Sequence, residues 1–378
     1  MLVIGIIVFA LGIAASIALH EAGHMAAAKS FGMRVRTYAI GMGPTIASYT
    51  PKNTPQTTTY ALKALPFGGY CDIAGMTVND PEPGDTPMYA QPLYQRVIVM
   101  LAGITMNLLI GFAIVLLLAF TSPIPNPGAD MRPVVDNVTA NSPADTAGLQ
   151  QHDLIVAVAD TPIEVYNEIS NVVAQHPEQT IPVEYIRDDT PHTTDITPDS
   201  DGKIGIQVKS NQLPYHPPST NPQDAFSHAS SYSAYVMQAS IEGIAKLPSY
   251  ILPTLNTIAG KQERDTQGPV SIVGASHVGG QLAQENQWPQ FLLILASLNY
   301  FLALFNLIPL PPFDGGHIVI NAYGAIRDSL RKSRGKHPIG AVNYEPLYAV
   351  TATVFGVLIL FGVIVMVADI TNPITLPN

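Results

Sequence analysis

The sequence predicts a polytopic α-helical membrane protein with four transmembrane helices and one domain inserted outside the membrane. Three observations lead to this fold class. The chain of 378 residues has a mean hydropathy of +0.23 and only 12% charged residues, against roughly 25% in soluble domains. Four segments are apolar over the roughly 20 residues that a spanning helix needs. The acidic residues concentrate in one central block, which indicates a second, aqueous environment.

The four apolar segments cover residues 2–19, 97–120, 291–310 and 347–367. The first of them is also compatible with a signal peptide. However, it has no basic residues before its apolar stretch, it lacks a small-residue cleavage site, and it runs directly into His20 and Glu21. We therefore expect it to be a retained helix.

The charges predict the orientation, because Lys and Arg are enriched in loops on the cytoplasmic side. Residues 121–290 contain 19 acidic and 7 basic residues, a net charge of −12, so we expect this block outside. Both termini then also lie outside, in a multi-pass protein of the inner (plasma) membrane. The expected cytoplasmic segments, residues 29–96 and the connector after the third span, carry these basic residues: Lys29, Arg34, Arg36, Lys52, Lys63, Arg96, Arg327, Arg331, Lys332, Arg334 and Lys336.

Composition excludes several kinds of site and partner. The single cysteine, Cys71, rules out an intramolecular disulfide framework and any metal site built from several thiolates of this chain. The net charge of −10 argues against a nucleic-acid partner, for which a basic surface would be expected. A metal, if bound, must be held by His and carboxylate side chains.

The acidic block contains a segment, residues 132–210, that resembles a PDZ domain. Short strands are expected at 134–138 and 155–158, a helix at 164–173 and an alternating strand at 204–208. His152 departs from the pattern, since such domains usually have Gly before the Asp. The alternative is an unrelated small β-domain. A Pro/Ser-rich linker follows at 211–220.

The end of the first span carries His20-Glu21-Ala22-Gly23-His24, an HExxH motif. Residues four apart share one face of a helix, so both imidazoles can reach one ion while Glu21 lies beside them. Ionisable groups at the end of an apolar helix are costly unless they face a cavity, a partner or a metal. The motif predicts Zn²⁺ bound by His20 and His24, with Glu21 as general base. The alternative is a polar cluster at the level of the lipid headgroups.

A catalytic zinc normally has three protein ligands, and the third must come from another segment. Asp314, in Asn306-Leu307-Ile308-Pro309-Leu310-Pro311-Pro312-Phe313-Asp314-Gly315-Gly316-His317, is the best candidate. The third span starts outside and reaches the inner side after about 20 residues, at the depth of His20 and His24. Two alternatives remain open: His317 as the third ligand, and Asp314 as a simple helix cap before a Gly-Gly turn.

The HExxH of the first span and the NLxPxPxxDGG of the third together resemble the site-2 protease family of intramembrane zinc metalloproteases. The nearest match is the four-span bacterial branch with one PDZ domain between spans two and three. Further stretches that resemble the family are Gly41-Met42-Gly43-Pro44, Pro66-Phe67-Gly68-Gly69-Tyr70, Gln95-Arg96, Ala102-Gly103 with Asn107, and Gln267-Gly268-Pro269-Val270.

The resemblance implies a zinc metalloendopeptidase that cleaves transmembrane segments in regulated intramembrane proteolysis. Its substrates would be single-span membrane proteins, such as anti-sigma factors after a first extracytoplasmic cut, or remnant signal peptides. It also implies a membrane re-entrant β-sheet, here with strands near 33–40 and 58–63, and substrate binding by Asn306, Asn299, Gly41 and Gly43. Asparagines that merely hold a broken helix are a nearly equal alternative.

A strand at 34–40 would place an edge beside His24, where an unwound substrate could add a strand. Two other functions are weighed against the protease: a membrane-anchored PDZ adaptor and a metal transporter. Neither function would require an HExxH motif, an acidic residue at the same membrane depth and a PDZ domain in one chain. The predicted division of the chain is helix 1 with HExxH at 1–28, a cytoplasmic-side re-entrant β region at 29–95, helix 2 at 96–120, an extracytoplasmic PDZ (α+β) domain at 132–210, an extracytoplasmic linker and amphipathic segment at 211–289, helix 3 with NLxPxPxxDGG at 290–326, and helix 4 at 346–368.

Overall fold

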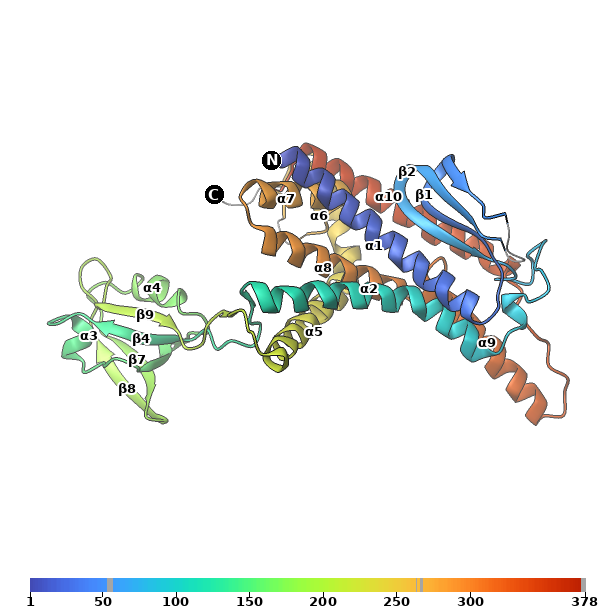
Figure 1. Cartoon of the computed structure of the whole chain (residues 1–378). Helices are drawn as coiled ribbons and strands as arrows, with labels where there is room; N and C mark the ends of the chain where they lie inside the picture. The colour runs from blue at the N-terminus through green and yellow to red at the C-terminus, as the bar shows by residue number, and fades with distance from the viewer. Residues whose placement is uncertain (53–56, 263, 266–267, 375–378) are drawn as a thin grey trace. The chain divides into compact units, whose positions relative to one another are not determined.

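The computed structural model describes residues 1–52, 57–262, 264–265 and 268–374. The chain divides into two compact units, each of which is described by itself. Unit 1 comprises Met1–Leu117 and Ser233–Asn378, and unit 2 comprises Leu118–Tyr232. Figure 1 labels the helices and strands along the chain.

Within the described residues, four helices are long and apolar enough to cross a membrane, so the four predicted spans are confirmed. α1 continues past residue 19, and the whole HExxH motif is therefore helical. The spans are α1 (Leu2–Ser30), α2 (Leu93–Thr121), α8 (Trp288–Asn306), and α10 (Tyr348–Thr371) preceded by the 3-10 turn η3 (Glu345–Leu347).

The segment predicted as one third helix, residues 290–326, is two helices. α8 ends at Asn306, a proline-rich stretch follows, and α9 (Asp314–Ser333) begins. The prolines end α8 because proline lacks the backbone N–H and clashes with the preceding turn. Gly315 and Gly316 lie inside α9, so the Gly-Gly turn is not formed, and the N-cap of α9 is Phe313 rather than Asp314.

α1 packs closely against α7 (Ile272–Gln284). A Cβ added to Gly279 would lie 2.5 Å from the ring of Phe9, and one added to Gly5 would lie 2.6 Å from Ala283. Phe9 also meets Phe291 of α8 edge to face, with ring centroids 5.1 Å apart. Small residues thus let these helices approach closely, as is typical of helix packing in membranes.

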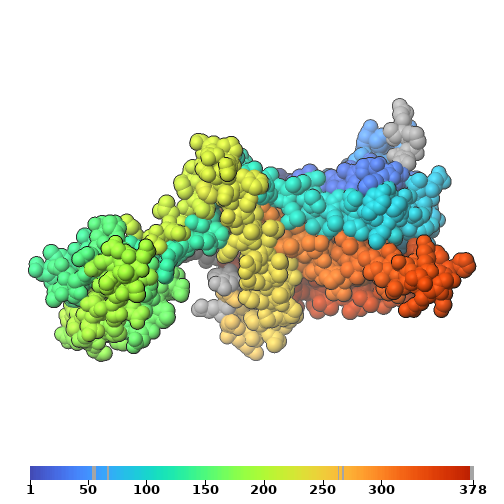
Figure 2. Space-filling view, turned by 90° about the horizontal axis from the view of Figure 1, so that it is seen from below, coloured from blue at the N-terminus to red at the C-terminus, as the bar shows by residue number. Residues whose placement is uncertain are grey.

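α2 lies alongside α8 and α9, as the cyan and orange segments of Figure 2 show. Gly111 of α2 faces the ring of Tyr300, to which an added Cβ would approach within 3.0 Å. Nearer the other end of α2, Arg96 donates to Asn321 of α9 at 2.6 Å.

The region predicted as a linker and amphipathic segment is largely helical. Gln267, within the predicted turn at 267–270, lies outside the described residues. The remaining short and intervening elements are η1 (Met88–Ala90), α5 (Pro222–Lys246), η2 (Leu247–Tyr250) and α6 (Ile251–Ile258).

Two long, bent strands, β1 (Val35–Tyr49) and β2 (Thr59–Ile73), form the sheet of unit 1. Residues 35–42 of β1 pair with residues 65–73 of β2 and also with residues 59–62. The prediction of a free edge at 34–40 is therefore wrong, because β2 folds around that strand. The outer positions of this sheet belong to residues 69–73 and 45–49.

Unit 2 contains a six-stranded sheet with the order β8-β7-β5-β4-β9, in which β6 pairs only with β5. Its core is apolar and includes Val135, Ile155 and Val183. The elements are β4 (Pro133–Val138), α3 (Pro143–Thr146), β5 (Leu154–Val158), β6 (Thr161–Pro162), α4 (Glu168–Val173), β7 (Ile181–Arg187), β8 (Thr190–Ile196) and β9 (Ile206–Ser210), with a separate pair of β3 (Ile124–Pro125) and β10 (Tyr215–His216).

The strands expected at 134–138 and 155–158 are β4 and β5. The expected helix is shorter, because the Glu168 carboxylate accepts bonds from the N–H groups of Glu164 and Val165 and holds that segment in a turn. His152 has a φ of 76°. Glycine adopts this left-handed conformation without steric cost.

Candidate metal centre

The HExxH motif supplies two imidazoles on one face of α1. His20 and His24 are buried, with 7% and 5% of their surface exposed. Their rings meet edge to face, with centroids 4.8 Å apart, and their Nε2 atoms lie 3.1 Å apart. Two Nε2 atoms this close can both face a shared cation.

The first turn of α9 supplies a carboxylate. Gly315 and Gly316 lie so close to the backbone of Leu307 and Leu310 that a Cβ on either would overlap it, at 2.3 and 2.4 Å. This close approach folds the start of α9 back onto the chain that leaves α8. Asp314, the first residue of α9, is thereby directed at α1, and the predicted meeting of the two motifs is found in the structure.

The three ligand atoms form a nearly regular triangle. Asp314 Oδ2 lies 3.3 Å from Nε2 of His20 and 3.3 Å from Nε2 of His24. The edges of a tetrahedron around zinc, with ligands about 2.0–2.1 Å from the metal, measure about 3.3–3.4 Å. Asp314 Oδ2 is also buried without a hydrogen-bond partner among the described residues. The donor set and its spacing fit a zinc ion with one coordination position open.

α2 makes room for the imidazoles. A Cβ added to Gly103 would lie 2.3 Å from Nε2 of His24 and 2.8 Å from Nε2 of His20. A Cβ added to Gly23 of α1 would lie 2.5 Å from the carbonyl oxygen of Ala102. Glycine is therefore required on both helices for α1 and α2 to meet at this point.

Glu21 lies between the triangle and the sheet, because it interacts with the charges of His24, His20 and Asp314 and also borders β2. Its carboxylate lies near the backbone N–H of Cys71, and its Cγ lies 3.2 Å from a Cβ position built on Gly69. Both contacts are with the outer strand of β2, residues 69–73. The acid beside the triangle thus borders a strand edge, a feature that sequence reasoning missed because a backbone N–H leaves no residue signal.

The structure separates the two asparagines predicted to bind substrate. Asn299 is fully buried, and its amide nitrogen donates to Ser16 Oγ at 3.0 Å and to the Leu295 carbonyl at 2.8 Å. Both of its hydrogens are therefore engaged. Asn306, at the end of α8, is half-buried, and its side chain has no hydrogen-bond partner within the described part of the chain.

Gly41 and Gly43 have φ values of 85° and 82° and lie where β1 bends. A Cβ on Gly41 would lie 2.5 Å from the Leu65 carbonyl oxygen. Their surroundings in the structure are those of a sheet bend, and their binding of substrate stays a prediction.

His317, the alternative ligand, lies outside the triangle. Its ring stacks on Tyr344 with centroids 5.6 Å apart, and its Nδ1 lies 3.3 Å from the Tyr344 hydroxyl. Burial lowers the pKa of His317 and raises the pKa of Tyr344 to about 12. Both side chains are therefore neutral near pH 7, which suits a hydrogen-bonded pair.

Comparison with known proteins decides the family. The family model described as peptidase family M50 matches residues 8–345. The chain belongs to peptidase family M50, the site-2 proteases. It is 36% identical to the zinc metalloprotease Rip1 of Mycolicibacterium smegmatis over 99% of this chain and 98% of that protein.

Two further relatives extend the comparison. The chain is 35% identical to the zinc metalloprotease Rip1 of Mycobacterium tuberculosis, over 100% of this chain and 99% of that protein. It is 30% identical to the probable membrane metalloprotease ARASP2 of Arabidopsis thaliana, over 83% of this chain and 70% of that protein. This site-2 protease is therefore an integral membrane zinc metalloprotease that acts within the membrane.

Proposed function

We propose that His20, His24 and Asp314 hold the zinc ion of this protease. The observation that carries the proposal is the buried triangle of two Nε2 atoms and one Oδ2 atom, 3.1–3.3 Å apart. Bound zinc supplies Lewis acidity and lowers the pKa of a bound water towards 7. Three acceptor atoms converging in an apolar environment need a cation to offset their desolvation.

Glu21 is the proposed general base. Glu21 follows His20 on the same helix, and its carboxylate lies near the Cys71 N–H at the border of the sheet. Glu21 takes a proton from the attacking water and returns it to the leaving amine, which general-base catalysis at a peptide bond requires. Asn306, whose amide has no hydrogen-bond partner among the described residues, is better placed than Asn299 to donate to the substrate carbonyl.

Substrate enters by strand addition at residues 69–73. A transmembrane helix hides its carbonyls in i to i+4 bonds, so it must unwind before hydrolysis. An unwound segment regains backbone bonds by pairing with a free strand edge. In this sheet the edge beside Glu21 is that of residues 69–73, in place of the 34–40 strand expected from the sequence. The sheet would then be the re-entrant element of the family.

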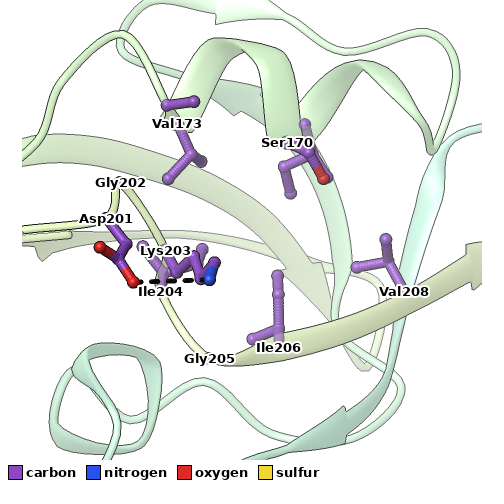
Figure 3. Close-up of a pocket in the computed structure, with 11 residues that line it drawn as sticks. Ser170, Val173, Asp201, Gly202, Lys203, Ile204, Gly205, Ile206 and Val208 are labelled. Carbon is purple, nitrogen blue, oxygen red and sulfur yellow. Dashed lines mark ion pairs between the residues drawn. The ribbon is translucent and has the colours of Figure 1, made fainter. Parts of the chain in front are cut away.

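Unit 2 is proposed to be an extracytoplasmic PDZ domain that restricts substrate access. A pocket lies between α4 and β9, and Figure 3 shows it lined by apolar side chains such as Val173, Ile206 and Val208. β9 is an outer strand of its sheet, so an extended peptide could pair there while its side chains fill the pocket. Deleting residues 132–210 should permit cleavage of full-length precursors with zinc retained. A folded deletion variant that still rejects them would place the filter elsewhere.

The physiological substrates are proposed to be anti-sigma factors already cut outside, or remnant signal peptides. The active site would lie near the cytoplasmic side of the inner membrane, because the segments next to it carry the basic residues. Comparing the membrane proteomes of cells with the parent protein and with a Glu21 variant would identify the substrates that accumulate.

The zinc assignment is tested on purified protein by elemental analysis and by cleavage of a model membrane substrate. Chelator should abolish cleavage, and zinc should restore it. His20→Ala and Asp314→Ala should each lower the bound zinc, whereas His317→Ala should retain it. Unchanged zinc in both ligand variants would refute the assignment. Metal transport or peptide binding without cleavage would favour a transporter or an adaptor instead.

A further inference from the structure

The face of α2 that meets α1 carries three groups at helical spacing, Val99, Gly103 and Asn107. Residues four apart lie on one face of a helix. The carbonyl oxygen of Val99 lies 2.7 Å from Nδ1 of His24, and the amide of Asn107 lies 3.2 Å from Nδ1 of His20. Gly103 leaves space for both Nε2 atoms between these two contacts. α2 therefore contacts Nδ1 of both imidazoles, the ring nitrogen that is not part of the triangle.

The Val99 contact fixes the tautomer of His24. A carbonyl oxygen only accepts, so Nδ1 of His24 carries the proton and Nε2 keeps its lone pair. An imidazole that binds a metal through Nε2 needs this tautomer, and an acceptor at Nδ1 also holds the ring in position.

The Asn107 contact is informative because a donor nitrogen of Asn107 faces the ring nitrogen of His20 that also has to donate. The atom of Asn107 nearest to His20 is Nδ2, which only donates, and it would face a protonated Nδ1 as donor to donor. Oδ1 of Asn107 is meanwhile buried without a partner among the described residues, and Asn107 is 1% exposed. Oxygen and nitrogen of an amide occupy nearly the same space, and the hydrogen-bond network decides their assignment. Turning the amide by half a turn resolves the clash and gives Oδ1 a donor.

We infer that Asn107 is a positioning residue, whose Oδ1 accepts the Nδ1–H of His20 and thereby holds that ring, in the zinc-binding tautomer, toward the metal. This inference rests on the proposed role of His20 as a ligand. Asn107 contacts no ligand atom of the triangle and takes no part in proton transfer. Its effect is exerted through His20, and the loss of such a partner typically lowers metal affinity by about 10- to 100-fold.

The test is the zinc dissociation constant of the purified full-length protein, measured by competition with a chelator of known affinity. Asn107→Leu, which keeps the volume but removes the acceptor, should weaken zinc binding about 10- to 100-fold. Asn107→Asp offers only acceptor oxygens, so it should bind zinc at least as tightly as the parent. The cobalt-loaded forms should show an altered visible spectrum for Asn107→Leu and the parental spectrum for Asn107→Asp.

Asn299→Leu is the matched control. Asn299 is also a buried amide that bonds α1, through Ser16, but it contacts neither imidazole. Its loss should lower thermal stability and leave zinc affinity unchanged. Two results would overturn the inference. One is a zinc affinity of Asn107→Leu equal to that of the parent, and the other is a zinc affinity of Asn107→Asp as weak as that expected for loss of the acceptor. If Asn107→Leu does not fold, Asn107→Asp against the parent still decides between acceptor and donor.

His20→Ala separates this inference from the ligand proposal. If His20→Ala binds zinc like the parent, the ligand set is wrong and the inference falls with it. If His20→Ala loses zinc while Asn107→Leu keeps parental affinity, the ligand set stands and only the role of Asn107 is refuted.

Discussion

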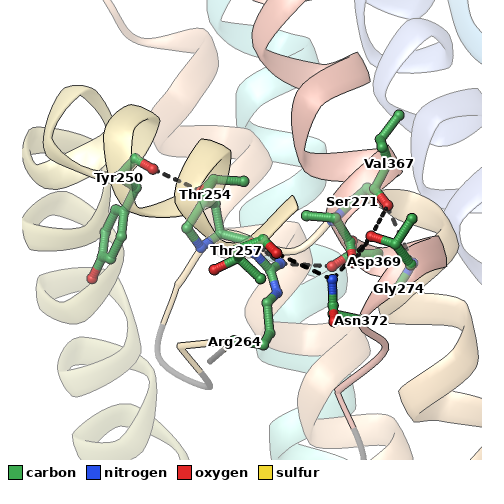
Figure 4. A network of polar contacts seen from close by, with 12 residues as sticks. Tyr250, Thr254, Thr257, Arg264, Ser271, Gly274, Val367, Asp369 and Asn372 are labelled. Carbon is green, nitrogen blue, oxygen red and sulfur yellow. Dashed lines mark hydrogen bonds and ion pairs between the residues drawn. The ribbon is translucent and has the colours of Figure 1, made fainter. Parts of the chain in front are cut away.

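Two of the buried polar clusters among the described helices of unit 1 contain carboxylates, and they differ in how their charges are balanced. At the candidate metal centre, His20, His24 and Asp314 direct three acceptor atoms at one point. In the second cluster, Arg264 donates to Asp369 of α10 at 2.6 Å, and the other oxygen of Asp369 accepts the Ser271 N–H at 2.6 Å. Figure 4 shows these bonds joining α10 to the start of α7.

A buried carboxylate paired with a cationic side chain indicates a structural contact, whereas one that faces only imidazoles indicates a candidate metal site. The ion pair of Arg264 and Asp369 supplies its own cation, and the side chains are only 9% and 1% exposed. The triangle contains no Lys or Arg, and with neutral imidazoles its three atoms are all acceptors, so a bound cation would offset their desolvation. Both places need a glycine, since a Cβ on Gly103 would meet His24 at 2.3 Å and one on Gly274 would meet Asp369 at 2.4 Å.

The largest effect on the cleavage rate is expected for substitution of Glu21, which lies beside the triangle but is not one of its three residues. Glu21→Gln should retain about one zinc per chain and lower the cleavage rate by about 10²- to 10⁴-fold or more, since the proposed general base is lost. Elemental analysis and cleavage of a model membrane substrate measure both quantities. Glu285→Gln, at an exposed glutamate that follows α7, is the control and should cleave normally. Substantial turnover by Glu21→Gln would assign the base to another group.

The second cluster should respond to substitution through stability alone. Asp369→Ala leaves the Arg264 guanidinium buried without its partner and should cost about 3–5 kcal/mol. Replacing the pair together, Arg264→Met with Asp369→Leu, should recover much of that loss, because a buried ion pair can often be exchanged for apolar groups. The unfolding of purified protein measures both effects, and zinc per folded chain should stay constant. A loss of zinc in the folded variants would mean that the cluster of Arg264 and Asp369 also affects the metal centre, and the two could not be treated as independent.

The sequence predicts the triangle well and the second cluster not at all. His20, Glu21 and His24 are adjacent in a motif whose helical spacing already defines a shared face, and topology brings Asp314 to the same depth. Arg264 and Asp369 are far apart in the chain and belong to no motif, so only the fold reveals the pair. Similarly, the Val99 carbonyl and the Cys71 N–H are backbone groups that no residue type announces.

The membrane spans were predictable because the length of an apolar segment is enough to identify them. The pairing of the strands was harder to predict. Residues 69–73 and 59–62 of β2 pair with the two sides of residues 35–40, and β1 itself bends at Gly41 and Gly43. Strand composition indicates a strand but does not determine its neighbours, so the free edge was assigned to the wrong segment. The break after Asn306 was signalled by prolines, but the length of α9 was not.

The glycines permit a paired test of the comparison. Gly103→Ala should lower zinc affinity by about 10-fold or more, because the methyl group must displace an imidazole of the proposed zinc site, and disturbing the groups that position a ligand typically has effects of this size. Gly274→Ala should displace the Asp369 carboxylate and lower the melting temperature with zinc affinity unchanged. Chelator competition and thermal unfolding on the same samples separate the two outcomes. Equal effects of both variants on zinc affinity would mean that helix separation, and not the local contact, controls the site.

The smallest effect is expected at Ser271, where side chain and backbone act separately. Its hydroxyl accepts from the Gly274 N–H at 3.2 Å as the N-cap of α7, while its own N–H donates to Asp369. Ser271→Ala removes only the cap and should lower the free energy of unfolding by about 0.5–2 kcal/mol. Ser271→Gly should lower it by only a few tenths of a kcal/mol, roughly, because glycine is tolerated at N-cap positions. Ser271→Pro also removes the N–H that Asp369 accepts, so its cost should exceed that of Ser271→Ala. Unfolding free energies of the three variants give the order. If Ser271→Ala and Ser271→Pro cost the same, the backbone bond to Asp369 contributes little, and the second cluster depends on the Arg264 contact alone.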